Sequence, residues 1–210
     1  MRYDHIVWDW NGTLLDDTWL CLEVFNRLLR AHGKDEITLE RYRDEFEFPV
    51  KNYYVRMGFD DTPEAFDKIA RDFMGEYERR RLECTLQPHV HETLESLHAR
   101  GVKMSVFSAY KEDTLKELIV HYRLDSFFEA VTGQTHIRGD GKLDRAQGHL
   151  EKIGSPAQRL LMVGDSPHDY EVAQALNADC VLLSNGHFPA HRLSSLGAPV
   201  LDNLAQLAFV

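Results

Sequence analysis

The sequence predicts an α/β protein built on a doubly wound parallel sheet, with a smaller all-helical domain inserted into it. Two observations lead to this fold class. Short apolar runs alternate with helical patterns along the chain, as parallel strands alternate with crossover helices. About ninety residues separate the first run from the second. That stretch is too long for one crossover, and it is rich in helix formers with little strand alternation.

Five apolar runs are candidate strands of this sheet. The first four are each followed by a polar or small residue and then by a helical pattern, and the fifth, near the end of the chain, is weaker. In chain order the runs are Ile6–Trp8, Val102–Phe107, Leu160–Val163, Val181–Leu183 and Pro199–Leu201.

The stretch after the first run predicts helices. In TWLCLEVFNRLLRAHG, the spacing of Leu20, Val24, Leu28 and Ala31 gives one apolar helical face, and Gly33 is a plausible stop. Farther along, TPEAFDKIARDFMGEYERRR begins with a threonine suited to capping a helix and a proline suited to its first position.

A helix leading into the second strand begins after Gln87-Pro88, in PHVHETLESLHARG. The sequence therefore predicts a core domain of residues 1–15 and 88–210 and a helical cap domain of residues 16–87.

Composition excludes several classes of function. Apolar residues make up 43% of the 210 residues and charged residues 28%, which is ordinary for a soluble globular protein. No apolar run is long enough for a membrane span, and Met1–His5 leads straight into strand-like sequence without a signal-peptide pattern, so we expect no membrane role and a cytoplasmic location. The net charge of -10 argues against a nucleic-acid partner. The three scattered cysteines, without CxxC spacing, suggest neither disulfides nor a zinc site.

Polar side chains follow the predicted strands at their C-terminal ends, where open parallel sheets gather ligand sites. They are Asp9 after the first strand, Ser108 after the second, and Asp165 with Asp169 after the third. Lys142 lies on a predicted loop between the second and third strands. We expect these five side chains to form one site.

Each of these features also has a purely structural interpretation. Gly12 could serve a tight strand-to-helix turn, and Ser108 could cap the helix after it. Ser166 and Pro167 suit the start of a helix, where an acid in the first turn interacts well with the helix dipole. Lys142 could be a solvated loop lysine. Only the combination of the features indicates a site.

The combination has a chemical rationale. Three carboxylates brought together repel and raise one another's pKa unless a cation lies among them. A hard, oxygen-seeking ion such as Mg²⁺ removes that conflict. Lys142 and the Ser108 hydroxyl would then supply a charge and a donor suited to phosphate oxygens.

The ordered motifs resemble those of the haloacid dehalogenase superfamily, and its phosphoglycolate-phosphatase-like branch in particular. The similarity lies in DxxGT from Asp9, the strand-end Ser108, Lys142, and GDSxxD ending at Asp169, and it extends over nearly the whole chain. It implies a Rossmann-like core, a helical cap, and a Mg²⁺-dependent phosphatase that acts on a small phosphorylated metabolite.

The resemblance also implies roles for the acidic residues. Asp9 would attack phosphorus and form an aspartyl-phosphate. The metal would be held by the Asp9 carboxylate, the backbone carbonyl of Asn11 and the Asp165 carboxylate. Asp169 would support the metal shell or orient Lys142.

The substrate would be bound by neighbouring residues. The resemblance implies that Ser108 and Lys142 bind the phosphoryl oxygens, and it places Thr13 and Ala109 in the same substrate site. Oligomeric state is open, with a monomer or a weak homodimer as the two expectations.

One departure from the family pattern affects the chemistry. The family's phosphatases carry a second aspartate two residues after the nucleophile, where this chain has Asn11. An amide can neither protonate a leaving group nor activate water, and general acid-base help is worth about 10² to 10⁴ in rate. His168, in the GDSPHD loop, is a weak candidate for the missing acid. A smaller departure is Asn177, which replaces the usual glycine after the following helix.

Two other functions remain open. Superfamily members that cleave carbon–halogen or phosphorus–carbon bonds also lack the second aspartate, although the acidic GDSxxD loop favours a metal and phosphate. A catalytically inactive protein with the same fold, which binds a metabolite or a protein, is the third possibility. In the cap, Arg43 and Lys51 could close over a substrate, whereas Tyr53 and Tyr54 are expected to pack into the cap core.

Overall fold

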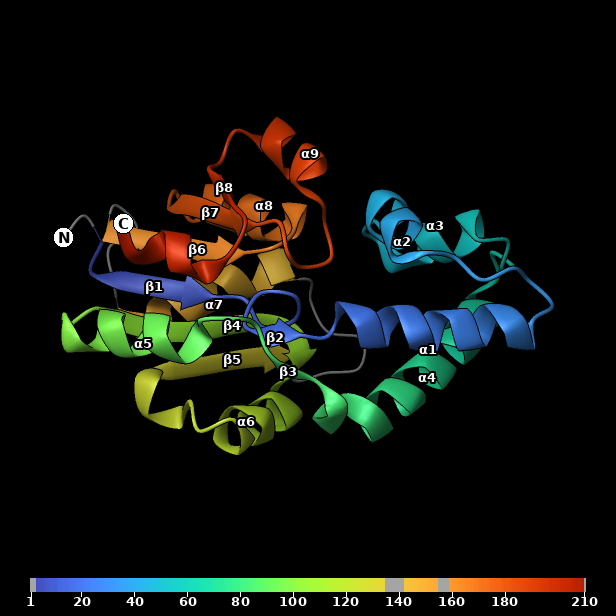
Figure 1. Cartoon of the computed structure of the whole chain (residues 1–210), viewed down its shortest axis with the longest axis horizontal. Helices are drawn as coiled ribbons and strands as arrows, with labels where there is room; N and C mark the ends of the chain where they lie inside the picture. The colour runs from blue at the N-terminus through green and yellow to red at the C-terminus, as the bar shows by residue number, and fades with distance from the viewer. Residues whose placement is uncertain (1–2, 135–141, 155–158, 210) are drawn as a thin grey trace. The chain divides into compact units, whose positions relative to one another are not determined.

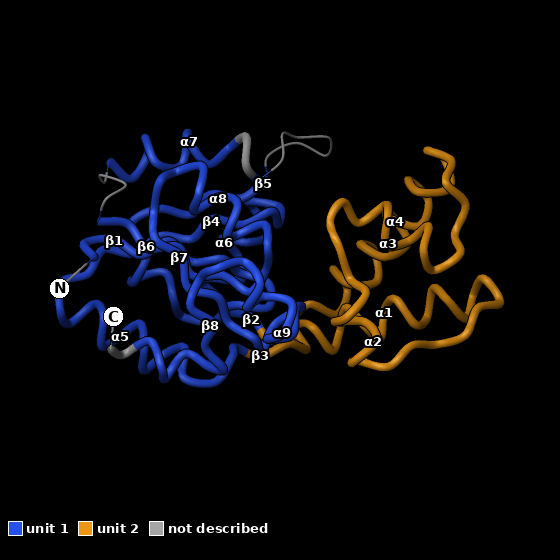
Figure 2. Tube along the Cα trace, turned by 90° about the horizontal axis from the view of Figure 1, so that it is seen from above, with its two compact units in different colours: residues 1–15, 86–210 blue, residues 16–85 orange. Residues whose placement is uncertain are grey.

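The protein is described here by a computed structural model that covers residues 3–134, 142–154 and 159–209 (Figure 1). It divides into two compact units, Met1–Leu15 with Leu86–Val210 and Asp16–Thr85 (Figure 2). We call these the core unit and the cap unit. The sequence-based division differs from these units by two residues at the second boundary.

A six-stranded parallel sheet forms the centre of the core unit in the described part of the chain, in the order β5-β4-β1-β6-β7-β8 (Figure 1). This confirms the predicted fold class, and all five predicted strands are present. The strands are β1 (His5–Trp8), β4 (Lys103–Lys111), β5 (Ala130–Gln134), β6 (Leu160–Gly164), β7 (Asp179–Leu183) and β8 (Val200–Leu201).

The strand β5 was not among the predicted strands. Its sequence, AVTGQ, contains a glycine and few large apolar residues, and only two of its five residues are buried. Such a strand lies at the edge of the sheet, where one side needs no partner, and it therefore lacks the apolar run of a central strand.

Helices cover both faces of the sheet. Helices α7 (Lys142–Ile153) and α8 (Pro167–Ala175) lie on one face, and α5 (Val90–Ala99) and α6 (Glu112–His121) lie on the other (Figure 1). The described part of the unit also contains a short helix, α9 (Ala190–Leu193), and 3-10 helices at Asp125–Phe127, Ser194–Leu196 and Leu204–Phe209. The core under α7 and α8 contains Val7, Phe107, Ala146, Leu160, Met162, Val172, Ala173 and Leu176.

The start of α8 follows the sequence prediction closely. Ser166 is its N-cap and Pro167 its first residue. At the other end, Asn177 adopts the left-handed conformation with φ 52°, and the amide of Ala178 donates to the carbonyl of Ala173. An asparagine can therefore end this helix in a conformation that usually favours glycine.

A chain of buried polar side chains runs beneath α7. His5 Nε2 lies 2.8 Å from Ser105 Oγ, which lies 2.9 Å from His149 Nε2. His149 Nδ1 lies 2.9 Å from Thr132 Oγ1, and its ring stacks on Phe107. The chain links β1, β4 and β5 to α7 by directional contacts.

These hydrogen-bonded buried side chains predict that the free energy of unfolding decreases in mild acid. Burial lowers the pKa of His5 to about 4 and that of His149 to about 3. An unfolded histidine binds a proton below about pH 6.5, whereas these two stay neutral in the fold, so stability falls as the pH drops from 6.5 toward 4. We expect a loss of up to about 2 kcal/mol per histidine between pH 6.5 and pH 5.

Urea unfolding at the two pH values measures this loss. The matched control is His149→Gln, whose free energy of unfolding should depend less steeply on pH. An equal pH dependence in the native chain and the variant would contradict the prediction.

The cap unit contains α1 (Thr18–Ala31), α2 (Leu39–Glu45), α3 (Val50–Arg56), α4 (Pro63–Arg80) and a 3-10 helix at Arg81–Glu83 (Figure 2). Gly33, with φ 66°, follows the end of α1 as predicted. Thr62 caps α4 by accepting from the amide of Ala65. The predicted apolar face of α1 is correct except for Ala31, which is exposed because the buried face turns toward Phe25 and Leu29 instead.

Aromatic rings form much of the cap core. Tyr53 and Tyr54 are buried, and both contact the ring of Phe25 at centroid distances of 5.0 and 5.3 Å. The predicted packing role of the two tyrosines is confirmed. Lys51, by contrast, forms an exposed ion pair with Asp61.

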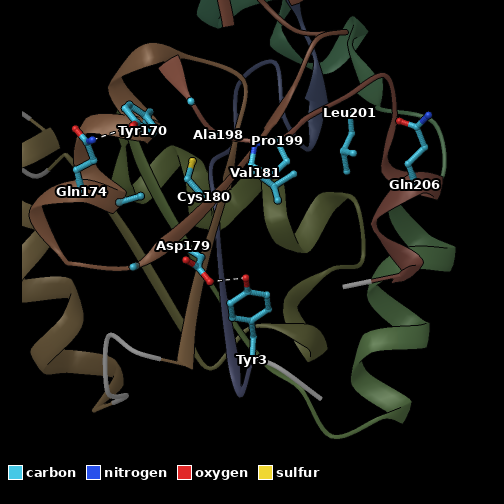
Figure 3. A pocket seen from close by; sticks show the side chains of 13 residues that line it. Tyr3, Tyr170, Gln174, Asp179, Cys180, Val181, Ala198, Pro199, Leu201 and Gln206 are labelled. Carbon is cyan, nitrogen blue, oxygen red and sulfur yellow. Dashed lines mark hydrogen bonds between the residues drawn. The ribbon is translucent and has the colours of Figure 1, made fainter. Parts of the chain in front are cut away.

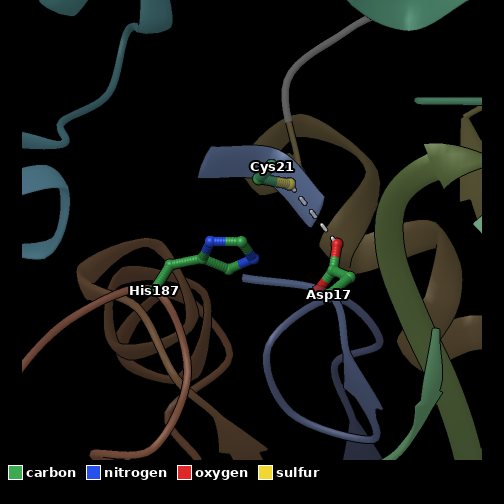
Figure 4. A group of neighbouring side chains, drawn as sticks. All are labelled: Asp17, Cys21 and His187. Atoms are coloured by element: carbon green, nitrogen blue, oxygen red, sulfur yellow. Dashed lines mark hydrogen bonds between the residues drawn. The ribbon is translucent and has the colours of Figure 1, made fainter. Parts of the chain in front are cut away.

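Two short strands, β2 (Leu15–Asp16) and β3 (Thr85–Leu86), pair where the chain passes between the units. In the cap unit beyond β2, the buried Asp17 accepts hydrogen bonds from Tyr77 Oη at 2.7 Å and from Cys21 Sγ at 3.6 Å. Figure 4 shows the contact with Cys21; the histidine drawn there belongs to the core unit.

All three cysteines are free thiols. None of the helices in the described ranges is long and apolar enough to cross a membrane.

Candidate active site

The loop after β1 places Asp9 at the C-terminal end of the sheet. The amide of Asp9 donates to the carbonyl of Val163 in β6 at 2.9 Å, which continues the parallel pairing for one more residue. The chain then turns at Gly12, whose φ is +72°. A Cβ there would lie 2.3 Å from Asp165 Oδ2, so both the backbone conformation and the space require glycine.

The loop after β6 supplies two more carboxylates. Asp165 is buried, and Asp169 is fully buried in the first turn of α8. Asp169 and Ser166 form a capping box in which each side chain bonds to the backbone amide of the other. The Asp169 carboxylate is therefore held rigidly by the helix that follows it.

Lys142 is the first residue of α7 rather than part of a loop, which corrects the prediction. Its buried Nζ lies 2.5 Å from Asp9 Oδ1 and 2.5 Å from Asp169 Oδ1. Burial alone would lower the pKa of this ammonium, but Asp169 and Asp9 outweigh burial and hold it above its ordinary value. Lys142 is thus a fixed positive charge that faces two carboxylates.

The three carboxylates carry more negative charge than one lysine neutralises. Oxygens of Asp9, Asp165 and Asp169 all lie within 4.8 Å of one another, and all three residues are buried. Burial and the charge of Asp169 raise the pKa of Asp9 to about 8, even though Lys142 acts in the opposite direction. A divalent cation with a preference for oxygen would relieve this repulsion, so the residues fit Mg²⁺.

The contacts of Asp169 bear on its two predicted roles. Its Oδ1 accepts from Lys142, and its Oδ2 accepts from Ser166 Oγ at 2.7 Å and from the amides of Ser166 and Asp165. These contacts match the role of orienting Lys142. Direct coordination of a metal by Asp169 stays a prediction.

Ser108 lies within β4, which continues to Lys111, and not at the end of the strand as predicted. It does not cap α6 either, because Lys111 holds the N-cap position. The buried Ser108 Oγ accepts from the amide of Tyr110 at 3.1 Å, while Ala109 beside it is exposed. Their roles toward a phosphoryl group stay predictions.

Thr13 and Asn11 lie in the turn that follows Asp9. The buried Thr13 Oγ1 is 3.5 Å from Asp165 Oδ1, so its hydroxyl faces an acidic residue of the site. Asn11 is half-buried and forms an isolated bridge with Leu15. Substrate binding by Thr13 and metal binding by the Asn11 carbonyl stay predictions.

The loop after β7 was not among the predicted site segments. The amide of His187 donates to Asp165 Oδ2 at 2.6 Å. The neighbouring Asn185 donates to Gln87 Oε1, and Gln87 Nε2 donates to the carbonyl of Gly12. The rule that strand ends carry ligand sites applies to β7 as well, and it would have drawn attention to SNGH.

His168, the candidate for the missing acid, lies in α8, where its Nε2 is 3.7 Å from Glu171 Oε2.

Substitution of Gly186, in the loop after β7, is expected to move the Asp165 carboxylate away from its position in the site. A Cβ there would lie 2.1 Å from Asp165 Oδ2, so Gly186→Ala must displace this carboxylate. We expect at least about tenfold weaker Mg²⁺ binding by calorimetry, because one misplaced ligand costs over about 1.4 kcal/mol. The matched control is Gly148→Ala in α7, where a Cβ would meet nothing within 4 Å. Equal Mg²⁺ affinity of the two variants would contradict the expectation.

A separate cavity of about 490 Å³ lies in the core unit (Figure 3). Its lining includes Tyr3, Tyr170, Cys180, Pro199 and Gln206, and Tyr3 Oη donates to Asp179 Oδ2 at 2.6 Å. Its lining contains none of the predicted site residues.

The family profile described as haloacid dehalogenase-like hydrolase matches residues 6–183. The chain belongs to this family. The matched range extends from β1 to β7 and includes Asp9, Ser108, Lys142, Asp165 and Asp169. The protein is therefore a haloacid dehalogenase-type hydrolase, and the resemblance inferred from its motifs is confirmed.

The relatives similar to this chain include a phosphoglycolate phosphatase and a 5'-nucleotidase. A phosphoglycolate phosphatase from Pseudomonas syringae pv. syringae is 30% identical over 212 residues, which cover 96% of this chain and 77% of the relative. A 5'-nucleotidase from Pseudomonas aeruginosa is 26% identical over 220 residues, 94% of each chain. The fold also matches the crystal structure of a predicted phosphatase from Clostridium acetobutylicum with a TM-score of 0.85, at 18% identity over 100% of this chain and 98% of that one.

Proposed function

We propose that this hydrolase is a Mg²⁺-dependent phosphomonoesterase that acts on a small phosphorylated metabolite. The observation that carries the proposal is the placement of Lys142, whose Nζ is 2.5 Å from both Asp9 and Asp169. This arrangement holds a nucleophilic carboxylate beside a fixed positive charge, as phosphoryl transfer requires. The similarity to a phosphoglycolate phosphatase and to a 5'-nucleotidase supports the same chemistry.

In this proposal Asp9 attacks the phosphorus atom. A bond forms between an Asp9 carboxylate oxygen and phosphorus, and the bond from phosphorus to the alcohol oxygen breaks. Water then attacks phosphorus, releases inorganic phosphate and restores the Asp9 carboxylate. Lys142 and Ser108 hold phosphoryl oxygens in both steps. A Mg²⁺ ion held by Asp9, Asp165 and the Asn11 carbonyl would neutralise charge on the phosphoryl group when bound.

Asn11 limits this chemistry at the proton transfers. The departing alkoxide needs a proton and the attacking water must lose one. The Asn11 amide can neither donate the first proton nor accept the second. We therefore propose a phosphatase that favours substrates with good leaving groups or draws protons from the substrate or solvent.

Phosphate release from p-nitrophenyl phosphate tests the proposal, because the p-nitrophenolate leaving group of this substrate departs without protonation. We expect turnover that requires Mg²⁺, stops on addition of EDTA and returns when Mg²⁺ is restored. No turnover despite Mg²⁺ binding by calorimetry would reject the phosphatase.

A binding role without catalysis is the second candidate, and Asn11 is the observation that favours it. Its signature would be tight binding of inorganic phosphate with Mg²⁺ and no turnover. Phosphorus–carbon cleavage has less support, because the superfamily members that catalyse it use a cap lysine that forms an imine, whereas Lys51 forms an ion pair with Asp61. Carbon–halogen cleavage has less support, because the cluster of carboxylates fits a metal ion. The cytoplasmic location and the choice between monomer and weak homodimer stay predictions.

A further inference from the structure

The pairing of β4 with β5 is irregular beside Ser108. The two strands pair in register up to Phe107 with Thr132, and the register then shifts before pairing resumes at Lys111 with Gln134. Ser108 and Ala109 therefore lie where the regular parallel ladder is interrupted. A strand without a regular ladder needs other contacts to hold its backbone in one position.

Arg145 of α7 spans this irregularity. Its Nη1 donates to the carbonyl of Gly133 in β5 at 2.6 Å, and its Nη2 donates to the carbonyl of Ser108 in β4 at 3.2 Å. The guanidinium also lies over the ring of Phe107, 5.5 Å from its centroid. One planar group therefore joins both strands where their own pairing is interrupted.

Other contacts hold the same segment from the opposite side. The amide of Gly133 donates to Glu112 Oε2 at 3.1 Å. A Cβ at Gly133 would lie 2.7 Å from the carbonyl oxygen of Tyr110, so the two strands approach closely there. The amide of Tyr110 in turn donates to Ser108 Oγ. The orientation of the Ser108 hydroxyl thus depends on the backbone that Arg145 holds.

We propose that Arg145 is a positioning residue that fixes Ser108 for phosphate binding by joining the carbonyls of Ser108 and Gly133. Arg145 lies one turn after Lys142 on α7, so the same contacts couple the lysine's helix to the Ser108 strand. The effect on substrate rests on the proposed phosphatase function, whereas the effect on the Ser108 segment does not.

The test compares Arg145→Met with Lys152→Met. Lys152 lies two turns farther along α7 and donates to the carbonyl of Val131 in β5 at 3.0 Å, but it is exposed and does not contact Ser108. The first readout is hydrogen exchange of the Tyr110 amide by NMR, without substrate. We expect about fivefold or faster exchange in Arg145→Met and unchanged exchange in Lys152→Met.

The second readout is kinetic. For p-nitrophenyl phosphate we expect Arg145→Met to raise KM and the inhibition constant of inorganic phosphate by about tenfold, the effect of one charge-assisted contact. Arg145→Lys should restore part of the loss because an ammonium can reach one carbonyl but not both. Added guanidinium should restore part of the loss in Arg145→Met.

The outcomes separate the two proposals. Native exchange of the Tyr110 amide in Arg145→Met would overturn the positioning role, whether or not the protein is a phosphatase. Faster exchange in a protein that releases no phosphate would support the positioning role and reject the phosphatase. Faster exchange with unchanged KM and phosphate inhibition in an active enzyme would overturn the link between Arg145 and phosphate binding.

Discussion

An Asp9→Asn variant is expected to release no measurable phosphate and, at the same time, to be more stable than the native protein without metal. Loss of the proposed nucleophile should lower turnover by about 10⁴-fold or more. The gain in stability follows from the cluster of three buried carboxylates around one ammonium. Removing one negative charge relieves repulsion worth on the order of 2 kcal/mol at pH 8.

Thermal unfolding with EDTA and with Mg²⁺ measures both parts of this expectation. Mg²⁺ should stabilise the native protein by mass action and the Asp9→Asn variant much less. The matched control is Asp4→Asn, at a half-buried acid outside the site whose Oδ1 pairs with Arg159. A variant at Asp9 that keeps its turnover would exclude the aspartyl-phosphate route, and one less stable than the native protein in EDTA would contradict the charge argument.

An Asn11→Asp variant is expected to gain activity, and the gain should depend on the leaving group. A carboxyl group at this position could protonate an alkoxide and then activate water. For a simple alkyl phosphate we expect kcat/KM to rise by about 10² or more. For p-nitrophenyl phosphate, whose leaving group needs no proton, the rise should be much smaller. The backbone carbonyl of residue 11 is the same in both proteins, so metal binding should change little.

The dependence on leaving group is the decisive readout for Asn11→Asp. A series of aryl and alkyl phosphates should give a steep dependence of rate on leaving-group pKa in the native protein and a shallow one in the variant. Asn11→Ala is the control without a carboxyl group, and it should keep the steep dependence. Equal slopes in all three proteins would mean that another group already supplies the proton.

Much of the fold could be predicted because its central strands and helix starts are local patterns. The apolar runs of β1 and β6 are continuous, since both faces of a central parallel strand are buried. The start of α8 is equally local, because Ser166 and Pro167 cap and open it within a few residues. Asp9, Asp165 and Asp169 could be predicted together because parallel strands bring their C-terminal ends to one edge.

The features that could not be predicted depend on contacts distant in sequence. β5 owes its position to pairing with β4 and lacks an apolar run of its own. Lys142 was expected on a loop because nothing in GDGKLDR resembles a helix start. Arg145 gave no signal in the sequence, since the two groups that accept its hydrogen bonds are the backbone carbonyls of Gly133 and Ser108, and every residue possesses such a carbonyl.

The insertion of the cap unit has a consequence for how this protein could diverge. The chain leaves the core after Leu15 and returns at Leu86, and the amide of Gln87 donates to the carbonyl of Leu14 at 2.9 Å. Because the exit and the return are hydrogen-bonded neighbours, the inserted segment can change in length or sequence without shifting the register of any strand in the sheet. Evolution can therefore exchange the cap as a module while the carboxylates and the lysine of the core are inherited unchanged.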